Sequence, residues 1–261
     1  MTCHDFDTAL LRRPGRSVVN GLSAGGGPAP TYEGVLAEHQ HYAEALAEAG
    51  VTVEMLEPLE AFPDSVFVED PALVFTEGAI LLRPGAPTRQ AEAEHLAPAL
   101  RRHFPIVETL AAGHADGGDV MVTPDLVLIG LSGRTDREGA LNLVAALDRL
   151  GRAARVIEPP RGALHLKTGG SLIDDDTVLT TPAGAASGRF DRFRVIVTEP
   201  GEEGAANALR VNARLLVAGQ YRRTVDRLAK DYDVIAVATD HISRIDAGLS
   251  CMSLRWKAPA R

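Results

Sequence analysis

The feature that most constrains the fold is a supersecondary unit that recurs along the chain. Each copy has a small or acidic lead segment, a strand, a polar turn and a second strand. The copies cover Ser65–Arg89, Asp116–Thr135, Thr168–Gly184 and Ala205–Thr224. Their lead segments begin near residues 64, 116, 168 and 205, so the spacings are about 52, 52 and 37 residues. Imperfect repetition of this kind indicates an architecture built from copies of one unit.

Helical periodicity alternates with these strand pairs. Apolar residues recur at helical spacing over Thr31–Ala49, Thr88–His103 and Asp136–Leu150, and more weakly over Arg223–Asp231. Gly50 and Gly151 directly follow the first and third segments, where a glycine commonly caps a helix. The alternation of strands and helices predicts an α/β protein.

The end of the chain predicts how the repeat closes. "DAGLSCMSLRW", Asp246–Trp256, reads as a fifth lead segment and the start of a buried strand, but only five residues follow it. Near the other end, Thr8–Ser17 resembles Ala79–Arg89 and can supply the missing second strand. We therefore predict a closed, five-bladed α/β propeller in one domain, residues 1–261. A generic α/β sandwich is the alternative.

Composition limits the classes of partner. The net charge of −8 argues against a nucleic-acid binder and is compatible with a cationic substrate. Two cysteines do not make a disulfide framework. The longest apolar run, Leu126–Leu131, is too short to cross a bilayer, and the first 15 residues lack the apolar run of a signal peptide. We expect a cytoplasmic protein with neither a nucleic-acid nor a membrane partner.

In a ring, the lead segments of different units meet near the axis, so chemistry is expected there. The residues concerned are Asp64, Glu69, Asp70, His114, Asp116, Asp119, His165, Lys167 and Cys251. Taken singly, the carboxylates could cap turns, and the histidine and cysteine could be structural. Together, a thiol, an imidazole and carboxylates are the groups that covalent catalysis requires. No CxxC or HExxH spacing favours a metal site.

Several lead motifs resemble those of the dimethylarginine dimethylaminohydrolase family, which belongs to the guanidine-modifying superfamily. They are "FPDSVFVEDP", "GGDV" with "LSGRT", "LHLKTG" and "IDAGLSCMSLRW", and the resemblance extends from Asn20 to Trp256. The family fold is a five-bladed ββαβ propeller, the pentein fold. The resemblance implies that Cys251 is the nucleophile, that His165 is the general acid and base, and that Asp116 orients the histidine.

The same resemblance implies a set of substrate-binding residues. Asp64, Glu69 and Asp70 would line the cationic end of the pocket. Arg89 and Arg134 would bind the amino-acid carboxylate, and the backbone carbonyls of Leu22 and Ile245 the α-amino group. The glycine-rich stretch Gly21–Pro30 would be a mobile lid, and its composition supports this independently.

The implied reaction is hydrolysis of N-omega-methylated arginine to citrulline and a methylamine through a covalent S-alkylthiouronium, with no metal or organic cofactor. The partner is then a small guanidino amino acid, and the resemblance is compatible with a homodimer. The alternatives are hydrolysis or deimination of arginine or agmatine, and a non-catalytic binding propeller. The two arginines favour a free amino acid over agmatine, which lacks the carboxylate. A papain-like enzyme is excluded because the histidine precedes the cysteine.

Overall fold

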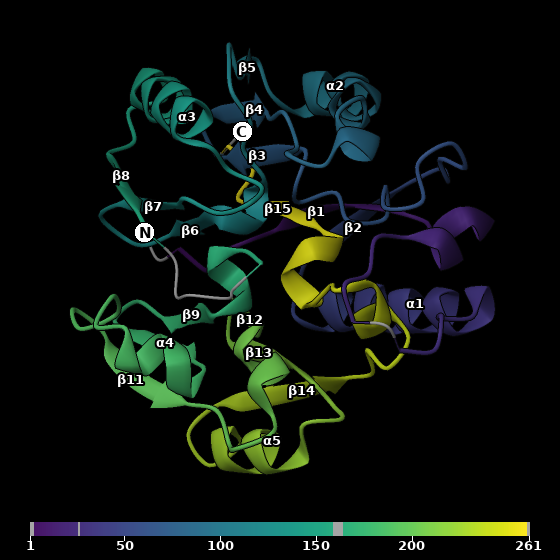
Figure 1. The fold of residues 1–261 in the computed structure, drawn as a ribbon, viewed down its shortest axis with the longest axis vertical. Coiled ribbons are helices and arrows are strands. Elements are labelled where there is room, and N and C mark those ends of the chain that lie inside the picture. Colours follow the sequence, from purple (N-terminus) through teal and green to yellow (C-terminus); the bar gives the residue numbers. More distant parts are fainter. Residues whose placement is uncertain (1–2, 26, 159–163, 260–261) are drawn as a thin grey trace.

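The structure, a computed structural model, describes residues 3–25, 27–158 and 164–259, and its strands form five three-stranded sheets around a common centre (Figure 1). The first four sheets, in chain order, are β3 (Ala72–Phe75), β4 (Gly78–Leu81) and β5 (Val107–Thr109); β6 (Val120–Val122), β7 (Val127–Gly130) and β8 (Ala154–Ile157); β9 (Gly170–Asp174), β10 (Thr177–Thr180) and β11 (Arg194–Val197); and β12 (Leu209–Val211), β13 (Arg214–Ala218) and β14 (Asp233–Val237). The fifth contains β15 (Leu254–Trp256), β1 (Thr8–Arg12) and β2 (Thr52–Leu56).

All five sheets have the same internal topology. The first two strands are antiparallel, and the second and third are parallel. A parallel pair needs a crossover connection, and in each unit a helix lies in that connection. These helices are α1 (Tyr32–Glu48), α2 (Glu92–His103), α3 (Arg137–Arg149), α4 (Pro182–Ala186) and α5 (Arg222–Leu228). The repeated ββαβ unit confirms the predicted architecture.

The two ends of the chain build the fifth sheet together. β1 is antiparallel to β15, with Ala9 opposite Arg255, and parallel to β2, with Ala9 opposite Val53. The N-terminal strand is therefore the missing second strand, as predicted. Within the described ranges no strand ladder joins one sheet to the next, so side-chain packing and single hydrogen bonds, such as that from the Leu166 N–H to Asp119, hold the units together.

Helix boundaries differ from the predicted ones in instructive ways. The helix expected from Thr88 begins at Glu92, because Pro87–Arg89 forms a separate 3₁₀ turn. α4 was not predicted, since its five residues, "PAGAA", carry no amphipathic period; the Thr181 hydroxyl caps it by accepting from the Gly184 N–H. Gly50 and Gly151 have φ values of +88° and +74°, as a helix-ending glycine should.

The lead segments are short helical turns. One-turn 3₁₀ helices precede four of the first strands, at Gly117–Asp119, Leu166–Thr168, Glu203–Ala206 and Leu249–Met252. Cys251 therefore lies in a turn, and the strand begins only at Leu254, so the expected strand through the cysteine was wrong. Likewise Ser65–Pro71 forms turns ahead of β3. A turn at the strand entrance can project polar side chains inward while the strand itself packs in the core.

The apolar core is distributed between neighbouring units and their covering helices. Val35, Tyr42 and Leu46 of α1 are fully buried, and the Tyr42 hydroxyl lies 2.6 Å from Ser253 Oγ beside β15. This contact joins the N-terminal helix to the C-terminal strand of the closing unit. None of the helices in the described part of the chain is both long and apolar enough to span a membrane.

Candidate active site

A small cavity of about 40 Å³ lies where the lead segments meet. Its lining includes nine of the ten site residues predicted from the sequence: Leu22, Asp64, Asp70, Arg89, Asp116, Arg134, His165, Ile245 and Cys251. They come from five segments of the chain, spread over more than 220 positions from Leu22 to Cys251. The ring therefore brings together side chains that the sequence places far apart.

His165 and Asp116 form a hydrogen-bonded pair in this cavity. His165 Nε2 lies 3.0 Å from Asp116 Oδ2, and the other oxygen of Asp116 accepts the Gly85 N–H at 2.7 Å. Each residue directly precedes a 3₁₀ turn, His165 before Leu166–Thr168 and Asp116 before Gly117–Asp119. Equivalent positions of two repeat units thus supply an imidazole and the carboxylate that fixes its orientation.

The surroundings of His165 favour its protonated form. Burial by itself lowers the pKa of His165, but the hydrogen bond to Asp116 and the charges of Asp70 and Asp119 outweigh it and raise this pKa. An imidazolium held in this way is a suitable general acid for a departing amine.

The surroundings of Cys251 favour its neutral form, the thiol. Burial and the charges of Glu69 and Asp70 raise the pKa of its thiol to about 12, and Lys167 opposes this only in part. Its carbonyl accepts the Glu69 N–H at 3.2 Å, which fixes the turn against the first lead segment. The thiol is therefore protonated in the free protein at neutral pH, and a bound cation is what would favour the thiolate.

Asp70 and Arg89 form a buried ion pair at the cavity. Asp70 also accepts the Gly118 N–H at 3.1 Å, while Arg89 binds Glu92 at 2.8 Å and the Phe67 carbonyl at 2.9 Å. Burial opposes ionisation of Asp70, but the Arg89 charge outweighs it and lowers the pKa of that carboxyl. Arg89 is only 5% exposed, and each of its guanidinium nitrogens has a protein partner, so its predicted contact with a substrate carboxylate would have to be added to these bonds.

Glu69 is the one predicted residue that does not line the small cavity. Its carboxylate lies 2.5 Å from Lys167 Nζ, accepts from the Ser250 hydroxyl at 2.9 Å and contacts Arg255 at 3.3 Å. It lines a separate, larger cavity together with Lys167, Ser250 and Arg255. Glu69 and Asp70 are consecutive in a turn and point to opposite sides of the wall between the cavities.

Asp64 and Leu22, which also line the cavity, are hydrogen-bonded to each other. Asp64 accepts the Leu22 N–H at 2.9 Å, and burial raises the pKa of this carboxyl. The expected lid contacts the segment before Cys251 through a side chain, because the Ser23 hydroxyl donates to the Arg244 carbonyl at 2.8 Å. Gly26, within that lid, lies outside the described residues. That Gly21–Pro30 is a mobile lid stays a prediction.

Two supporting roles were not predicted from the sequence, although Asp119 was among the candidate lead residues. Glu92 is buried and binds Arg89, and only its spacing of three positions in a polar stretch hints at this. Asp119 is fully buried and accepts the Leu166 N–H at 2.9 Å and the Thr135 hydroxyl at 2.7 Å. Asp119 thereby fixes the turn that follows His165, a role that no local pattern indicates.

Ligand-type atoms of Asp70, Asp116 and His165 lie within 4.8 Å of one another. Such a set could hold a metal ion by spacing alone. Here Asp70 is already paired with Arg89, and Asp116 with His165, so these bonds would compete with coordination.

Comparison with known proteins gives consistent relatives. The chain matches the arginine deiminase family over residues 58–218. It is 37% identical over 254 residues to N(G),N(G)-dimethylarginine dimethylaminohydrolase of Pseudomonas aeruginosa, covering 96% of this chain and 100% of that protein. It is 33% identical to the enzyme of the same name from Streptomyces coelicolor, covering 95% of this chain and 96% of that protein.

Solved structures agree. A cysteine-to-serine mutant of the Pseudomonas aeruginosa enzyme complexed with citrulline has a TM-score of 0.92 and 38% identity, covering 96% of this chain and 99% of that one. The N-terminal domain of a cyanobacterial arginine dihydrolase bound to its substrate has a TM-score of 0.84 at 19% identity, covering 97% of this chain and 98% of that one, which supports the fold alone. From the near full-length similarity, the chain belongs to the dimethylarginine dimethylaminohydrolase family.

Proposed function

We propose that this protein hydrolyses N-omega-methylated L-arginine to citrulline and a methylamine. The observation that carries the proposal is one cavity lined by a thiol, a hydrogen-bonded histidine and aspartate, and further carboxylates, in a member of this family. The carboxylates suit a guanidinium, and the thiol suits nucleophilic attack on its carbon.

The first half of the reaction forms the covalent intermediate. The substrate guanidinium binds beside Asp70, and its positive charge lowers the pKa of the Cys251 thiol, which loses its proton to solvent. Sγ then bonds to the guanidinium carbon. His165, as imidazolium, donates its proton to the substituted nitrogen, the C–N bond breaks, and the methylamine departs. An S-alkylthiouronium remains on Cys251.

The second half releases the product. His165, now neutral, takes a proton from a water molecule that attacks the same carbon. The C–S bond breaks with its electron pair returning to sulfur, and the new hydroxyl becomes the carbonyl of citrulline. Its remaining proton goes to the thiolate, which restores the resting thiol. Throughout, Asp116 holds the His165 ring and stabilises its positive charge. His165 thus protonates the departing amine and deprotonates the attacking water.

The remaining residues select an amino acid. Arg134 lines the cavity from the second unit and is proposed to bind the substrate carboxylate, with the Arg89 charge close behind. The carbonyls of Leu22 and Ile245 are proposed to accept from the α-ammonium group. Only the carboxylate contact favours a free amino acid over agmatine, which keeps the amine but lacks the carboxylate. Arginine and methylated arginine share both groups.

The decisive experiment measures citrulline formed from arginine, monomethylarginine and asymmetric dimethylarginine, by wild type and Cys251→Ser. We expect the methylated substrates to be preferred and the variant to be inactive. Equal turnover by Cys251→Ser would refute the mechanism, and preference for arginine would reassign the substrate.

Three statements stay predictions: a cytoplasmic location without a nucleic-acid partner, one domain over residues 1–261, and a homodimer. Cell fractionation, limited proteolysis and light scattering would test them in turn.

A further inference from the structure

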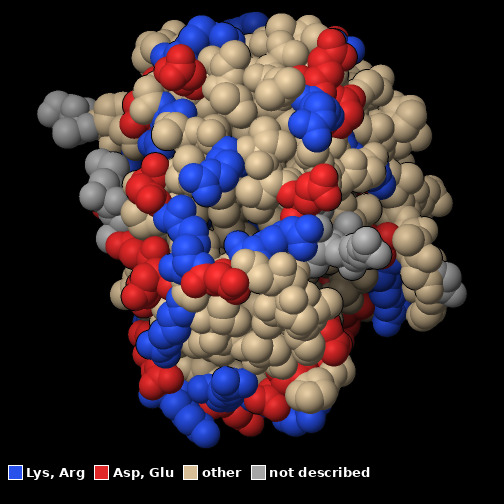
Figure 2. Space-filling view, turned by 60° about the vertical axis from the view of Figure 1, so that its left-hand side comes forward, with Lys and Arg blue, Asp and Glu red and all other residues tan. Residues whose placement is uncertain are grey.

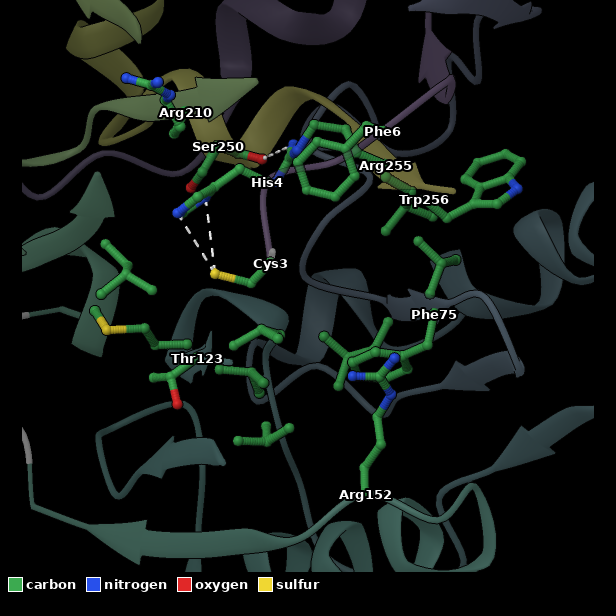
Figure 3. A pocket seen from close by; sticks show the side chains of 18 of the residues that line it. Cys3, His4, Phe6, Phe75, Thr123, Arg152, Arg210, Ser250, Arg255 and Trp256 are labelled. Atoms are coloured by element: carbon green, nitrogen blue, oxygen red, sulfur yellow. Dashed lines mark hydrogen bonds between the residues drawn. The ribbon is translucent and has the colours of Figure 1, made fainter. Parts of the chain in front are cut away.

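The larger cavity holds a second cluster of reactive side chains. This cavity, of about 440 Å³, shares no lining residue with the active-site cavity (Figure 3). Cys3 and His4 line it, and the figure shows the Cys3 sulfur directed at the His4 ring. Asp175, in the turn between β9 and β10, completes the cluster.

The three ligand-type atoms have the spacing of neighbouring corners of a tetrahedron around one ion. Cys3 Sγ is 3.5 Å from His4 Nε2 and 3.9 Å from Asp175 Oδ1, and Nε2 is 3.8 Å from Oδ1. Zinc bonds of about 2.3 Å to sulfur and about 2.0–2.1 Å to nitrogen and oxygen put tetrahedral ligand atoms roughly 3.3–3.6 Å apart. Movements of a few tenths of an ångström would therefore bring all three into bonding range.

The surroundings suit an ion that enters from solvent. His4 is 8% exposed, and its carbonyl accepts the Asn212 N–H at 2.8 Å, which fixes the segment. Asp175 is exposed, so the side it occupies is open and a water molecule can complete the coordination. Asp174 also lies near His4 and favours a cation, while Arg210 opposes one.

The donor set selects the class of metal. Thiolate with imidazole suits zinc and its spectroscopic substitute cobalt, whereas magnesium and calcium prefer oxygen donors throughout. Burial lowers the pKa of His4, so its ring is neutral and has a lone pair at pH 7. Burial and Asp175 raise the pKa of Cys3 to about 12, so binding must release the thiol proton to solvent.

We infer that Cys3, His4 and Asp175 form a binding site for one zinc-class divalent ion, separate from the active site. Cys3 and His4 precede β1 of the closing unit, and Asp175 belongs to the third sheet in chain order. A bound ion would tie these two parts together across 172 positions of sequence.

The test is a cobalt titration of the full chain, without an affinity tag, carrying Cys251→Ser. The chain has only two cysteines, so a thiolate-to-cobalt absorption band in this background must come from Cys3. We expect one equivalent to bind with that band and with the strong visible bands of tetrahedral cobalt, and zinc to displace it. Absence of the band, or its persistence after Cys3→Ser is added, would overturn the site.

A matched pair of variants tests the carboxylate. Asp175→Asn should weaken cobalt binding by about 10-fold or more. Asp176→Asn changes the neighbouring exposed carboxylate, which accepts from the Thr177 hydroxyl, and should leave the affinity within twofold. Equal effects of the two changes would reduce Asp175 to a nonspecific charge and overturn its role as a ligand. Neither variant touches the proposed hydrolase site, so failure here leaves the proposed reaction standing.

Discussion

The chain contains two sets of cysteine, histidine and aspartate, and their surroundings give them different chemistry. In one set Cys251 lines a cavity with His165 and Asp116; in the other Cys3 lies beside His4 and Asp175. Burial raises the pKa of both thiols to about 12, so a protonated resting thiol does not distinguish them. The histidines do differ, because the pKa of His165 is raised and that of His4 is lowered.

The cause is the contact between histidine and aspartate. His165 is 3.0 Å from Asp116, which is only 1% exposed, so a full hydrogen bond forms away from water. His4 is 3.8 Å from Asp175, which is 46% exposed by its side chain, so solvent screens the attraction and burial of the ring dominates. The same residue types therefore give a candidate acid catalyst in one place and a candidate metal ligand in the other.

The largest expected contrast is between the two thiols. Cys251→Ser should lower turnover by about 10⁴-fold or more, because a serine hydroxyl is a much weaker nucleophile than a thiolate in this site. The turnover of Cys3→Ser should stay within twofold of the wild-type value in metal-free buffer. Steady-state citrulline assays measure both. Similar losses in the two variants would show that the cavities are not chemically independent.

The aspartates give the next contrast. Asp116→Asn should lower turnover by about 10²–10⁴-fold, the usual contribution of acid–base catalysis. Removing the negative charge lowers the pKa of His165, so less imidazolium exists at high pH and the alkaline limb of the pH–rate profile should move to lower pH. Asp175→Asn should leave the profile unchanged. An unmoved limb in Asp116→Asn would contradict the assignment of His165 as the acid.

The wall between the cavities allows a smaller effect to be measured. Lys167→Met removes the cation that binds Glu69 and opposes the raised pKa of Cys251, so that pKa should rise further. A rise of one unit reduces the thiolate population about tenfold, and kcat/KM should fall by a similar factor. Lys257→Met is the control, since Lys257 pairs instead with Asp5 at 3.1 Å. Equal values of kcat/KM in the two variants would show that Lys167 does not influence the reactivity of Cys251.

The smallest expected effect is a shift in titration. A bound, unreactive guanidine analogue should lower the pKa of Cys251 by about one unit, through charge attraction, and leave that of Cys3 unchanged. Thiolate absorbance in Cys3→Ser reports Cys251, and in Cys251→Ser it reports Cys3. A shift of both thiols would mean that the analogue changes the whole fold, and a shift of neither would exclude activation by the substrate.

Much of the fold could be predicted because each repeat unit has a recognisable local pattern of apolar, polar and turn residues. Strand pairs, three long helices and the glycines after two of them follow from periodicity and from φ requirements. The short helix α4 and the 3₁₀ turns at the lead segments could not be predicted, since a single turn has no hydrophobic period. The strand expected through Cys251 failed for this reason.

Part of the candidate site could also be predicted from the sequence. Motif resemblance selected nine residues that line one cavity, because each belongs to a motif that can be recognised from neighbouring residues. It did not separate Glu69 from Asp70, since neighbouring residues in a turn can face two cavities and nothing in the local pattern says which. Glu92, which supports Arg89, was missed, and Asp119 was named without its role in holding the His165 turn, because the role of a buried carboxylate is recognised only through its partners.

By itself, the sequence determined the repeating unit, the pairing of the two chain ends and the types of side chain at the lead segments, since these depend on local period and composition. The tertiary structure decided which of two similar cysteine, histidine and aspartate sets has a raised histidine pKa. The raised pKa depends on the 3.0 Å contact between His165 and Asp116, which lie 49 positions apart in the sequence, and on the burial of that contact. Distances and desolvation across a ring are properties of packing, and no segment of the chain encodes them alone.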